Sequence, residues 1–227
     1  MHPTFHRAAN FAAAKFMRGL FGSVGRIHVL RRENAECAGG FLLASNHISH
    51  FDPLIISGVV RRKIDWMAMA EFFPRPVVGH FLRAVDAFPA DRHRADRKTI
   101  RTAIERLKRG RAVGIFPEGG IRHGEMSILH GAPLRSGVSA LADITAVPIV
   151  PCVILGSDRL YNARRWLPLR RTPIWIAFGE AIPHSSDREQ IEKEFNAMLQ
   201  KLYAELRNAF ALTPNDLPHS PQERMKE

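Results

Sequence analysis

The sequence has few of the features that mark secreted, metal-stapled or membrane-spanning proteins. Its 227 residues include only two cysteines, Cys37 and Cys152, which form neither a disulfide framework nor the closely spaced pairs of a zinc site. No stretch reaches the roughly 18 unbroken apolar residues of a membrane span, because Pro148 and Pro151 interrupt the longest apolar run, residues 144–155. The Gly-x-Ser-x-Gly elbow of many serine hydrolases is also absent. These absences favour a globular domain in a reducing compartment.

The sequence also contains fewer acidic residues than basic ones. The chain carries 33 Lys and Arg against 22 Asp and Glu, which gives a formal net charge of +11. Such an excess favours an anionic partner, whether nucleic acid, anionic lipid or a phosphorylated substrate. Charge alone does not choose among these three.

Apolar runs that alternate with helical periodicity organise the middle of the chain. The predicted strands cover residues 41–43, 64–69, 85–88, 112–116, 147–155 and 173–178. The predicted helices cover residues 53–60, 100–107 and 191–210, the last with a capping box formed by Ser186 and Glu189. This alternation predicts one α/β domain over residues 27–211, with a largely parallel central sheet flanked by helices.

Three other segments carry separate expectations. Residues 1–26 have the pattern of a basic amphipathic helix, which either anchors the protein at a membrane interface or packs on its own domain. Residues 72–82 are aromatic and broken by prolines, so they form a loop over the core or a lid for an apolar ligand, and the loop is favoured. Residues 212–227 are polar and proline-bearing, which predicts a disordered tail.

A histidine and an aspartate follow the first central strand. His47 and Asp52 are separated by four residues and come after the apolar run 41–43. Open α/β sheets place their ligands at the carboxyl ends of strands, and a tight turn there brings the two side chains together. A carboxylate that accepts the imidazole N–H fixes the tautomer and leaves the other ring nitrogen free as a base. A lone histidine is more often structural, so the pair needs support from elsewhere in the chain.

That support comes at residues 116–120, Phe-Pro-Glu-Gly-Gly, which end another predicted strand. Glycines at a strand end let the backbone approach a ligand closely, and free N–H groups there suit an anion. Simple turn chemistry is the alternative explanation. Arg122 and His123 follow directly, which favours a phosphate group as the anion.

Taken in order, these elements resemble the signature of the glycerolipid acyltransferases that make phosphatidic acid. The resemblance rests on Asn46-His47 with Asp52, the Phe-Pro-Glu-Gly block at 116–119 and the proline-bearing strand at 147–151. It extends from about residue 41 to residue 182 and implies a fold like that of glycerol-3-phosphate acyltransferase. The His–Asp spacing alone is a weak signal, whereas the three elements in order are a strong one.

The resemblance implies roles for individual residues. His47 would be the general base and Asp52 its orienter, so that an acceptor hydroxyl attacks the thioester of acyl-CoA or acyl-carrier protein. No cofactor or metal is implied. The predicted substrate-binding residues are Asn46, Arg92, Glu118, Gly119 and Arg122. The favoured reaction converts 1-acyl-sn-glycerol 3-phosphate to phosphatidic acid, by a cytoplasmic protein held peripherally on an anionic membrane surface.

Two positions depart from the family pattern. Asp86 replaces a usual glycine before the aromatic residue of the second block. Gly120 and Ile121 then replace a usual threonine and shift the arginine to Arg122, one residue later than in the family. The second change leaves the acceptor open among lysophosphatidate, glycerol 3-phosphate and other lyso or amino lipids.

Two rival functions come from different classes. A metal-dependent hydrolase could use His47, His50 and Asp52, because their spacing allows them to bind one ion. The further candidate ligands are His80, His93, His123 and His130. A basic nucleic-acid-binding protein is the second rival, but it draws only on net charge and lacks a recognisable motif.

Overall fold

A computed structural model describes residues 19, 22–91, 97–134, 137–167 and 171–226. The predicted basic helix over residues 1–26 lies almost entirely outside these ranges, and so does Arg92. None of the helices in the described part of the chain combines the length and apolar character needed to cross a bilayer.

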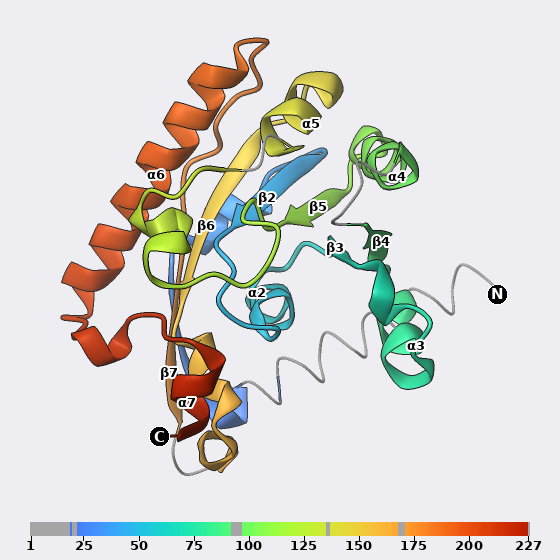
Figure 1. Ribbon diagram of the computed structural model, residues 1–227. Coiled ribbons are helices and arrows are strands. Elements are labelled where there is room, and N and C mark those ends of the chain that lie inside the picture. Colours follow the sequence, from blue (N-terminus) through green and yellow to red (C-terminus); the bar gives the residue numbers. More distant parts are fainter. Residues whose placement is uncertain (1–18, 20–21, 92–96, 135–136, 168–170, 227) are drawn as a thin grey trace.

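A mixed but mainly parallel sheet forms the centre of the molecule (Figure 1). Its strands are β1 (Gly25–Leu30), β2 (Phe41–Ser45), β3 (Ile64–Met69), β4 (Phe88–Ala90), β5 (Ala112–Ile115), β6 (Ile149–Leu155) and β7 (Thr172–Phe178). They lie in the order β1-β7-β6-β2-β5-β3-β4. Only the β6–β7 pair among these is antiparallel. The predicted α/β class with a largely parallel sheet is confirmed.

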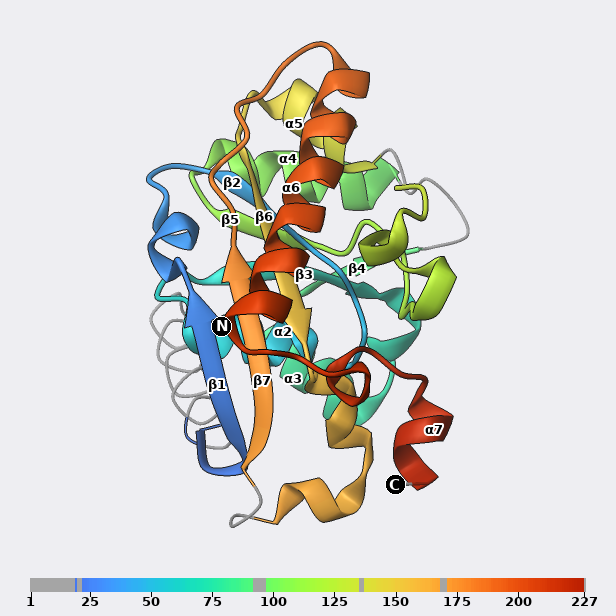
Figure 2. The ribbon, with the colours of Figure 1, turned by 90° about the vertical axis from the view of Figure 1, so that its left-hand side faces the viewer.

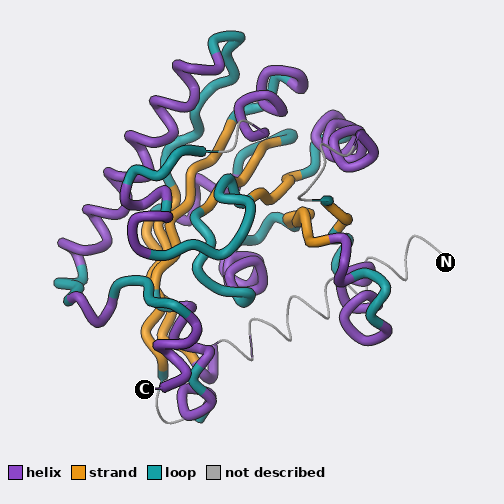
Figure 3. The backbone as a smooth tube through the Cα atoms, viewed as in Figure 1, coloured by secondary structure: helices purple, strands orange, loops and turns teal. Residues whose placement is uncertain are grey.

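Helices cover both faces of this sheet. The α-helices of the described residues are α2 (Asp52–Val59), α3 (Pro76–Ala84), α4 (Arg97–Lys108), α5 (Gly137–Thr145), α6 (Arg188–Ala209) and α7 (Pro221–Lys226). Helices α4, α5 and α6 share one buried apolar cluster with the sheet, and α2 shares the other. Figures 2 and 3 show the long α6 lying along the sheet, with the strands between it and α2.

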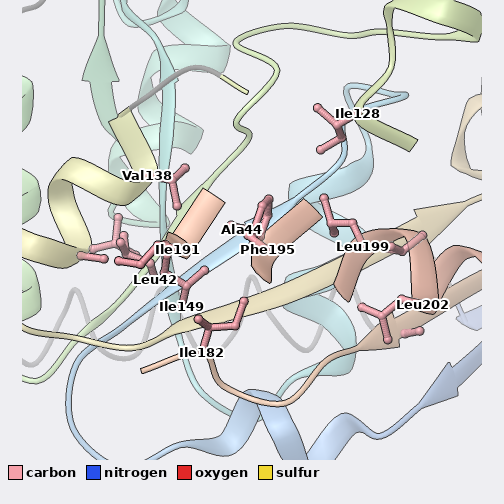
Figure 4. Close-up of a cluster of buried hydrophobic side chains, with 14 of the residues drawn as sticks. Leu42, Ala44, Ile128, Val138, Ile149, Ile182, Ile191, Phe195, Leu199 and Leu202 are labelled. Atoms are coloured by element: carbon pink, nitrogen blue, oxygen red, sulfur yellow. The ribbon is translucent and has the colours of Figure 1, made fainter. Parts of the chain in front are cut away.

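The two clusters follow from the sequence of the central strands. In β2, Leu42 and Ala44 face the α4–α6 side, whereas Phe41 and Leu43 face α2. All four are fully buried, and Figure 4 shows Leu42 and Ala44 among side chains of α6 and β6, including Phe195. A strand covered on both faces is expected to be apolar on both, which is why residues 41–44 of β2 are an unbroken apolar run. Each large side chain buried in this way contributes roughly 1.5–3 kcal/mol.

The region predicted as a loop over residues 72–82 is instead largely helical. Helix α3 begins at Pro76 and runs to Ala84. Proline breaks a helix interior but suits the first helical position, because its fixed φ matches and its missing N–H would be unpaired there anyway. The helix exposes Val77 and Val78. The prediction was wrong because Pro76 was interpreted as a breaker when it is a helix start.

Three smaller boundaries also differ from expectation. Asp187, rather than Ser186, caps α6 by accepting the N–H of Gln190 at 3.0 Å. The short strand expected over residues 85–88 is β4, which begins only at Phe88. Strand β1 was not predicted, because it is a half-buried edge strand with polar residues in place of an apolar run.

The C-terminal segment is ordered, which corrects the prediction of a disordered tail. A 3₁₀ turn at Pro214–Asp216 is followed by α7. Arg224 is 2% exposed and its Nε donates to Asp158 Oδ2 at 2.6 Å. The polar composition of the tail suggested disorder, but its charges find buried partners on the rest of the domain.

Candidate active site

Two loops that follow neighbouring parallel strands form the site. The first joins β2 to α2 and carries His47, and the second follows β5 and carries Glu118 and Arg122. Because β2 and β5 are parallel, their carboxyl ends lie at the same edge of the sheet. The Arg122 N–H donates to the His47 carbonyl oxygen at 2.8 Å, and the His47 N–H donates to Glu118 Oε2 at 2.5 Å. The two predicted motifs are therefore in direct contact.

His47 and Asp52 form the predicted pair. His47 Nδ1 lies 2.8 Å from Asp52 Oδ2, and the Asp52 side chain is fully buried. The His47 side chain keeps 15% of its surface exposed, so the ring reaches the surface of the site. An imidazole whose Nδ1–H donates to a carboxylate presents Nε2 as the free, basic nitrogen.

The buried Asp52 carboxylate is held mainly by neutral hydrogen-bond donors. The N–H groups of Ile48 and Ser49 both donate to Oδ2 at 2.8 Å. The Ser157 hydroxyl donates to the other oxygen, Oδ1. Asp52 also lies in the first turn of α2, where the helix dipole favours a negative charge. These contacts stabilise the charged carboxylate at a position that water does not reach.

An aromatic stack fixes the plane of the His47 ring. The ring lies on Phe116 with centroids 3.9 Å apart at 15°, and Phe116 lies on Trp66 at 4.8 Å and 11°. Gly114 in β5 makes room, because a Cβ there would lie 2.4 Å from the Trp66 ring. Trp66 Nε1 donates to Ser57 Oγ at 2.8 Å, which orients the last ring. No sequence pattern predicts this stack, since Phe116 enters the sequence analysis only as part of a motif.

Glu118 ties the second loop to the first. Its Oε1 accepts the Ser127 hydroxyl and the Ile128 N–H, both at 2.9 Å, while Oε2 accepts the His47 N–H. Burial raises the pKa of Glu118 to about 7, although the three hydrogen bonds favour its charged form. Since both oxygens already have partners, Glu118 acts on the geometry of the His47 turn.

This arrangement matches a known family. The acyltransferase family profile covers residues 26–155, which is more than half of the chain. The chain belongs to the acyltransferase family.

Individual relatives are more specific. The 1-acyl-sn-glycerol-3-phosphate acyltransferase of Bacillus subtilis (strain 168) is 34% identical over 133 residues, or 58% of this chain and 64% of that protein. The enzyme of the same name from Streptococcus pneumoniae is 23% identical over 167 residues, or 73% of this chain and 58% of that protein. The alignments thus span less than two thirds of these relatives.

A solved structure shares the fold. The crystal structure of the 1-acyl-sn-glycerophosphate (LPA) acyltransferase PlsC from Thermotoga maritima superposes with a TM-score of 0.70 at 25% identity. The superposition covers 89% of this chain and 81% of that one. The predicted fold class is therefore confirmed by comparison as well as by topology.

Two of the residues that were predicted to bind substrate make other contacts in the structure. The Asn46 amide is fully buried, donating to the Ile154 carbonyl at 2.9 Å and accepting the Ile154 N–H at 2.8 Å. It therefore joins the end of β2 to β6. Gly119 has a left-handed φ of 65°, and its N–H donates to Phe116 O at 2.9 Å. Its N–H is therefore used within the turn, and its part in binding the substrate stays a prediction.

The remaining predicted residues lie at the site or outside the described ranges. Arg122 is partly exposed beside His47, and its Nη1 donates to the Ile121 carbonyl at 3.2 Å. Arg92 is not among the described residues. His50 is exposed, with its N–H donating to the Tyr161 hydroxyl at 3.1 Å and its ring edge-on to Phe72. Tyr161 comes from the 3₁₀ segment Ser157–Tyr161, which follows β6.

The contacts of Asp52 bear on the metal-hydrolase alternative. Both of its oxygens already accept hydrogen bonds from the protein, on Oδ2 from His47 and two backbone amides and on Oδ1 from Ser157. Within the described ranges, no three His, Cys, Asp or Glu side chains are grouped as metal ligands would be. His93, one of the further candidates, lies outside those ranges. The geometry favours a His–Asp base over a metal-binding set.

Proposed function

We propose that this protein transfers a fatty acyl group from a thioester donor to the hydroxyl of a lysophospholipid. The observation that carries the proposal is the His47–Asp52 pair, with its 2.8 Å contact, in a chain of the acyltransferase family. The names of the Bacillus and Streptococcus relatives favour 1-acyl-sn-glycerol 3-phosphate as the acceptor and phosphatidic acid as the product.

In the proposed reaction His47 is the general base. Its Nδ1–H donates to Asp52, and Nε2 takes the proton of the acceptor hydroxyl as that oxygen attacks the thioester carbonyl carbon. The C–S bond then breaks, and the thiolate leaves with the proton that His47 received. Asp52 keeps its charge throughout and stabilises the imidazolium. The stack on Phe116 limits rotation of the ring, so Nε2 keeps its direction between the two substrates.

Positive charge beside His47 suits a phosphorylated acceptor. Arg122 is joined to the His47 turn through its backbone, and His123 follows it. Arg92, which matches an arginine of the family pattern, remains a proposed phosphate contact. The absence of the usual threonine at Gly120 affects which headgroup fits, because a hydroxyl that could bond the acceptor is missing.

A direct assay tests this function. Purified protein would be given labelled acyl-CoA or acyl-carrier protein in separate reactions, each with a panel of lysophospholipids and glycerol 3-phosphate. We expect His47→Ala to lower kcat roughly a hundred- to ten-thousandfold. His50→Ala is the matched control, since it should keep activity in an acyltransferase but lose it in a metal-dependent hydrolase. Full turnover by the His47 variant would refute the mechanism.

We also propose peripheral binding to an anionic membrane, where a lysophospholipid is presented. The net charge of +11 and the basic pattern of residues 1–26 support it. Sedimentation with anionic vesicles should capture the full chain in low salt, and deletion of the first twenty residues should weaken capture. Equal capture of both proteins would contradict the role of that segment. Binding to DNA but not to vesicles would favour the nucleic-acid alternative.

A further inference from the structure

Ser157 contacts the acid of the site but takes no part in the chemistry described above. Its hydroxyl donates to Asp52 Oδ1, the oxygen that His47 does not use. Ser157 and Asp52 are both fully buried. Two neutral amides and one imidazole hold Oδ2, so Ser157 is the one described side chain seen to hold Oδ1. Without it, Oδ1 would lose this hydrogen bond, and the carboxylate would be positioned through the contacts of Oδ2 alone.

The turn that carries Ser157 has a specific geometry. It follows β6, the neighbour of β2 in the sheet, and begins at Gly156 with a left-handed φ of 84°. A Cβ on Gly156 would lie 2.5 Å from the Pro173 carbonyl oxygen. Only glycine fits both constraints. The turn therefore fixes the direction in which the chain leaves β6. This direction places Ser157, the next residue, within hydrogen-bonding distance of Asp52.

The C-terminal segment, residues 213–226, holds this turn from the other side. Asp158, next to Ser157, is fully buried and its Oδ2 accepts Arg224 Nε at 2.6 Å and the His219 N–H at 3.0 Å. Arg224 Nη2 also donates to the carbonyls of Asn215 and Leu217, at 3.1 and 2.8 Å. The Arg224 guanidinium thus joins the turn after β6 to the backbone of the C-terminal segment.

A second arginine reinforces the contact. Arg159 is 7% exposed, and its Nη2 donates to Asp216 Oδ1 at 2.5 Å and to the Asn215 carbonyl at 2.9 Å. Its guanidinium carbon lies 5.5 Å from the centre of the Trp175 ring in β7. Opposite charges at two consecutive residues, Asp158 and Arg159, therefore each meet a partner in the C-terminal segment.

We propose that Ser157 is a positioning residue for the His47–Asp52 pair, and that the C-terminal segment keeps it in place through Arg224 and Asp158. The kinetic test of this inference rests on the proposed acyl transfer. The path runs from Arg224 to Asp158, through the backbone to Ser157, and from its hydroxyl to Asp52. Ser157 is fully buried and bonded to Asp52, so we expect its effect to pass through the carboxylate.

The first test is Ser157→Ala, assayed alone and combined with Asp52→Asn. In the otherwise unchanged enzyme we expect kcat to fall roughly ten- to a hundredfold, the effect of losing a hydrogen bond to a charged group, while KM for both substrates stays the same. In the Asp52→Asn background the same change should have little further effect, because the group it orients is altered. Ser139→Ala is the matched control, since Ser139 is also buried and donates to a carboxylate, Glu192, at 2.6 Å.

A spectroscopic measurement separates this inference from the proposed function. The hydrogen-bonded Nδ1–H proton of His47 should give a low-field NMR signal, which Ser157→Ala shifts and Ser139→Ala does not. If the wild-type protein transfers no acyl group, the proposed function fails, but this signal still decides the inference. An unmoved signal, unchanged kcat or equal losses in both backgrounds would overturn the role of Ser157.

The second test is Arg224→Met, with Arg188→Met as control because Arg188 pairs with Asp143 at the surface. We expect a several-fold loss of kcat with unchanged KM in the first variant and no change in the second. Thermal melting would verify that each is folded. Should Arg224→Met unfold at the assay temperature, the double variant Asp158→Asn with Arg224→Met removes both buried charges and takes its place. A folded variant with full kcat would overturn the role of the C-terminal segment.

Discussion

Asp52 and Asp65 are both fully buried aspartates, yet their surroundings differ in kind. Asp52 accepts hydrogen bonds from two backbone amides, a hydroxyl and the His47 ring. Asp65, in β3, is surrounded by cations: Arg111 Nε lies 2.6 Å from Oδ2, Arg106 Nη1 3.3 Å from it, and Lys63 Nζ 3.9 Å from Oδ1. Burial is the largest influence on the pKa of Asp65, which it raises, while the three cations lower it.

The difference shows how one type of residue serves two purposes. A buried carboxylate must be compensated. Neutral donors compensate Asp52 without cancelling its charge, so the charge remains available to orient an imidazole and stabilise its protonated form. Cationic side chains compensate Asp65 and offset its charge, so it joins β3 to α4 and to Arg111, the residue before β5. We therefore expect changes at Asp52 to affect catalysis and changes at Asp65 to affect stability.

The largest effect should come from Asp52→Asn. Asparagine keeps the shape and can still accept the amide bonds, but it carries no negative charge to stabilise a protonated His47. We expect kcat to fall roughly a hundredfold or more, as when general-base assistance is weakened, with a melting temperature near that of the wild type. Steady-state kinetics and thermal unfolding on the same sample measure both quantities. A large loss of stability with unchanged kcat would contradict the catalytic role expected of Asp52.

Asp65→Asn should show the reverse pattern. The variant leaves three cations facing a neutral amide, and we expect a loss of roughly 3 kcal/mol in the free energy of unfolding. This is the low end of the range for a broken buried ion pair, because Lys63 and Arg111 are each about a third exposed. Urea unfolding measures the loss. Below the transition, kcat per folded molecule should equal that of the wild type, and a reduced value would assign Asp65 to the site.

Glu118 extends the comparison to a carboxylate that is compensated by neutral donors but still titrates. Its pKa is raised by burial from 4.5 to about 7, so the folded state binds the proton more tightly than the unfolded state does. This contribution to stability is complete below pH 4.5 and is lost as pH rises towards 7. We expect it to lower the free energy of unfolding by about 2 to 3 kcal/mol across that window.

Glu118→Gln isolates this contribution, because glutamine does not titrate. Urea unfolding of both proteins at a series of pH values gives the difference in slope. The wild type should lose stability relative to the variant as pH rises from 4.5 to 7. Parallel curves would show that the buried carboxylate has the same pKa in the folded and unfolded states.

The smallest effect concerns Asp86, which pairs with Lys63 and Arg111 beside Asp65. It has a left-handed φ of 57° at the position where the family resemblance has a glycine. Asp86→Ala should destabilise the protein by losing these pairs and by placing a Cβ in that conformation. Asp86→Gly should be more stable than Asp86→Ala by about 1 kcal/mol, because glycine adopts positive φ freely. Equal unfolding free energies for the two variants would show that the backbone carries no strain.

Local patterns predicted most of the fold. The central strands were found because they are unbroken apolar runs, and α4 and α6 because their apolar residues recur with helical spacing. The edge strand β1 and helix α3 lack a pattern of this kind. Their structure depends on β7 as a pairing partner in one case and on Pro76 as a helix start in the other.

The candidate site was predicted in the same partial way. The pairing of His47 with Asp52 was predicted from their short spacing in the chain. The contact between His47 and Glu118 follows because the carboxyl ends of parallel strands lie at the same edge of the sheet. Asn46 was predicted to bind substrate from the family resemblance, but its amide is bonded to Ile154, far along the chain. Ser157 was missed although it lies two residues after the end of a buried strand, which is the signal that could have identified it.

By itself, the sequence determined which strands are buried, which helix faces are apolar and which histidine has a carboxylate within one turn, because each of these depends on neighbours in the chain. Only the tertiary structure decided what compensates each buried charge. The partners of Asp52, Asp65 and Asp158 come from residues up to 105, 46 and 66 positions away. Such partners are chosen by packing of the sheet and its covering segments, and no local pattern in the chain records that choice.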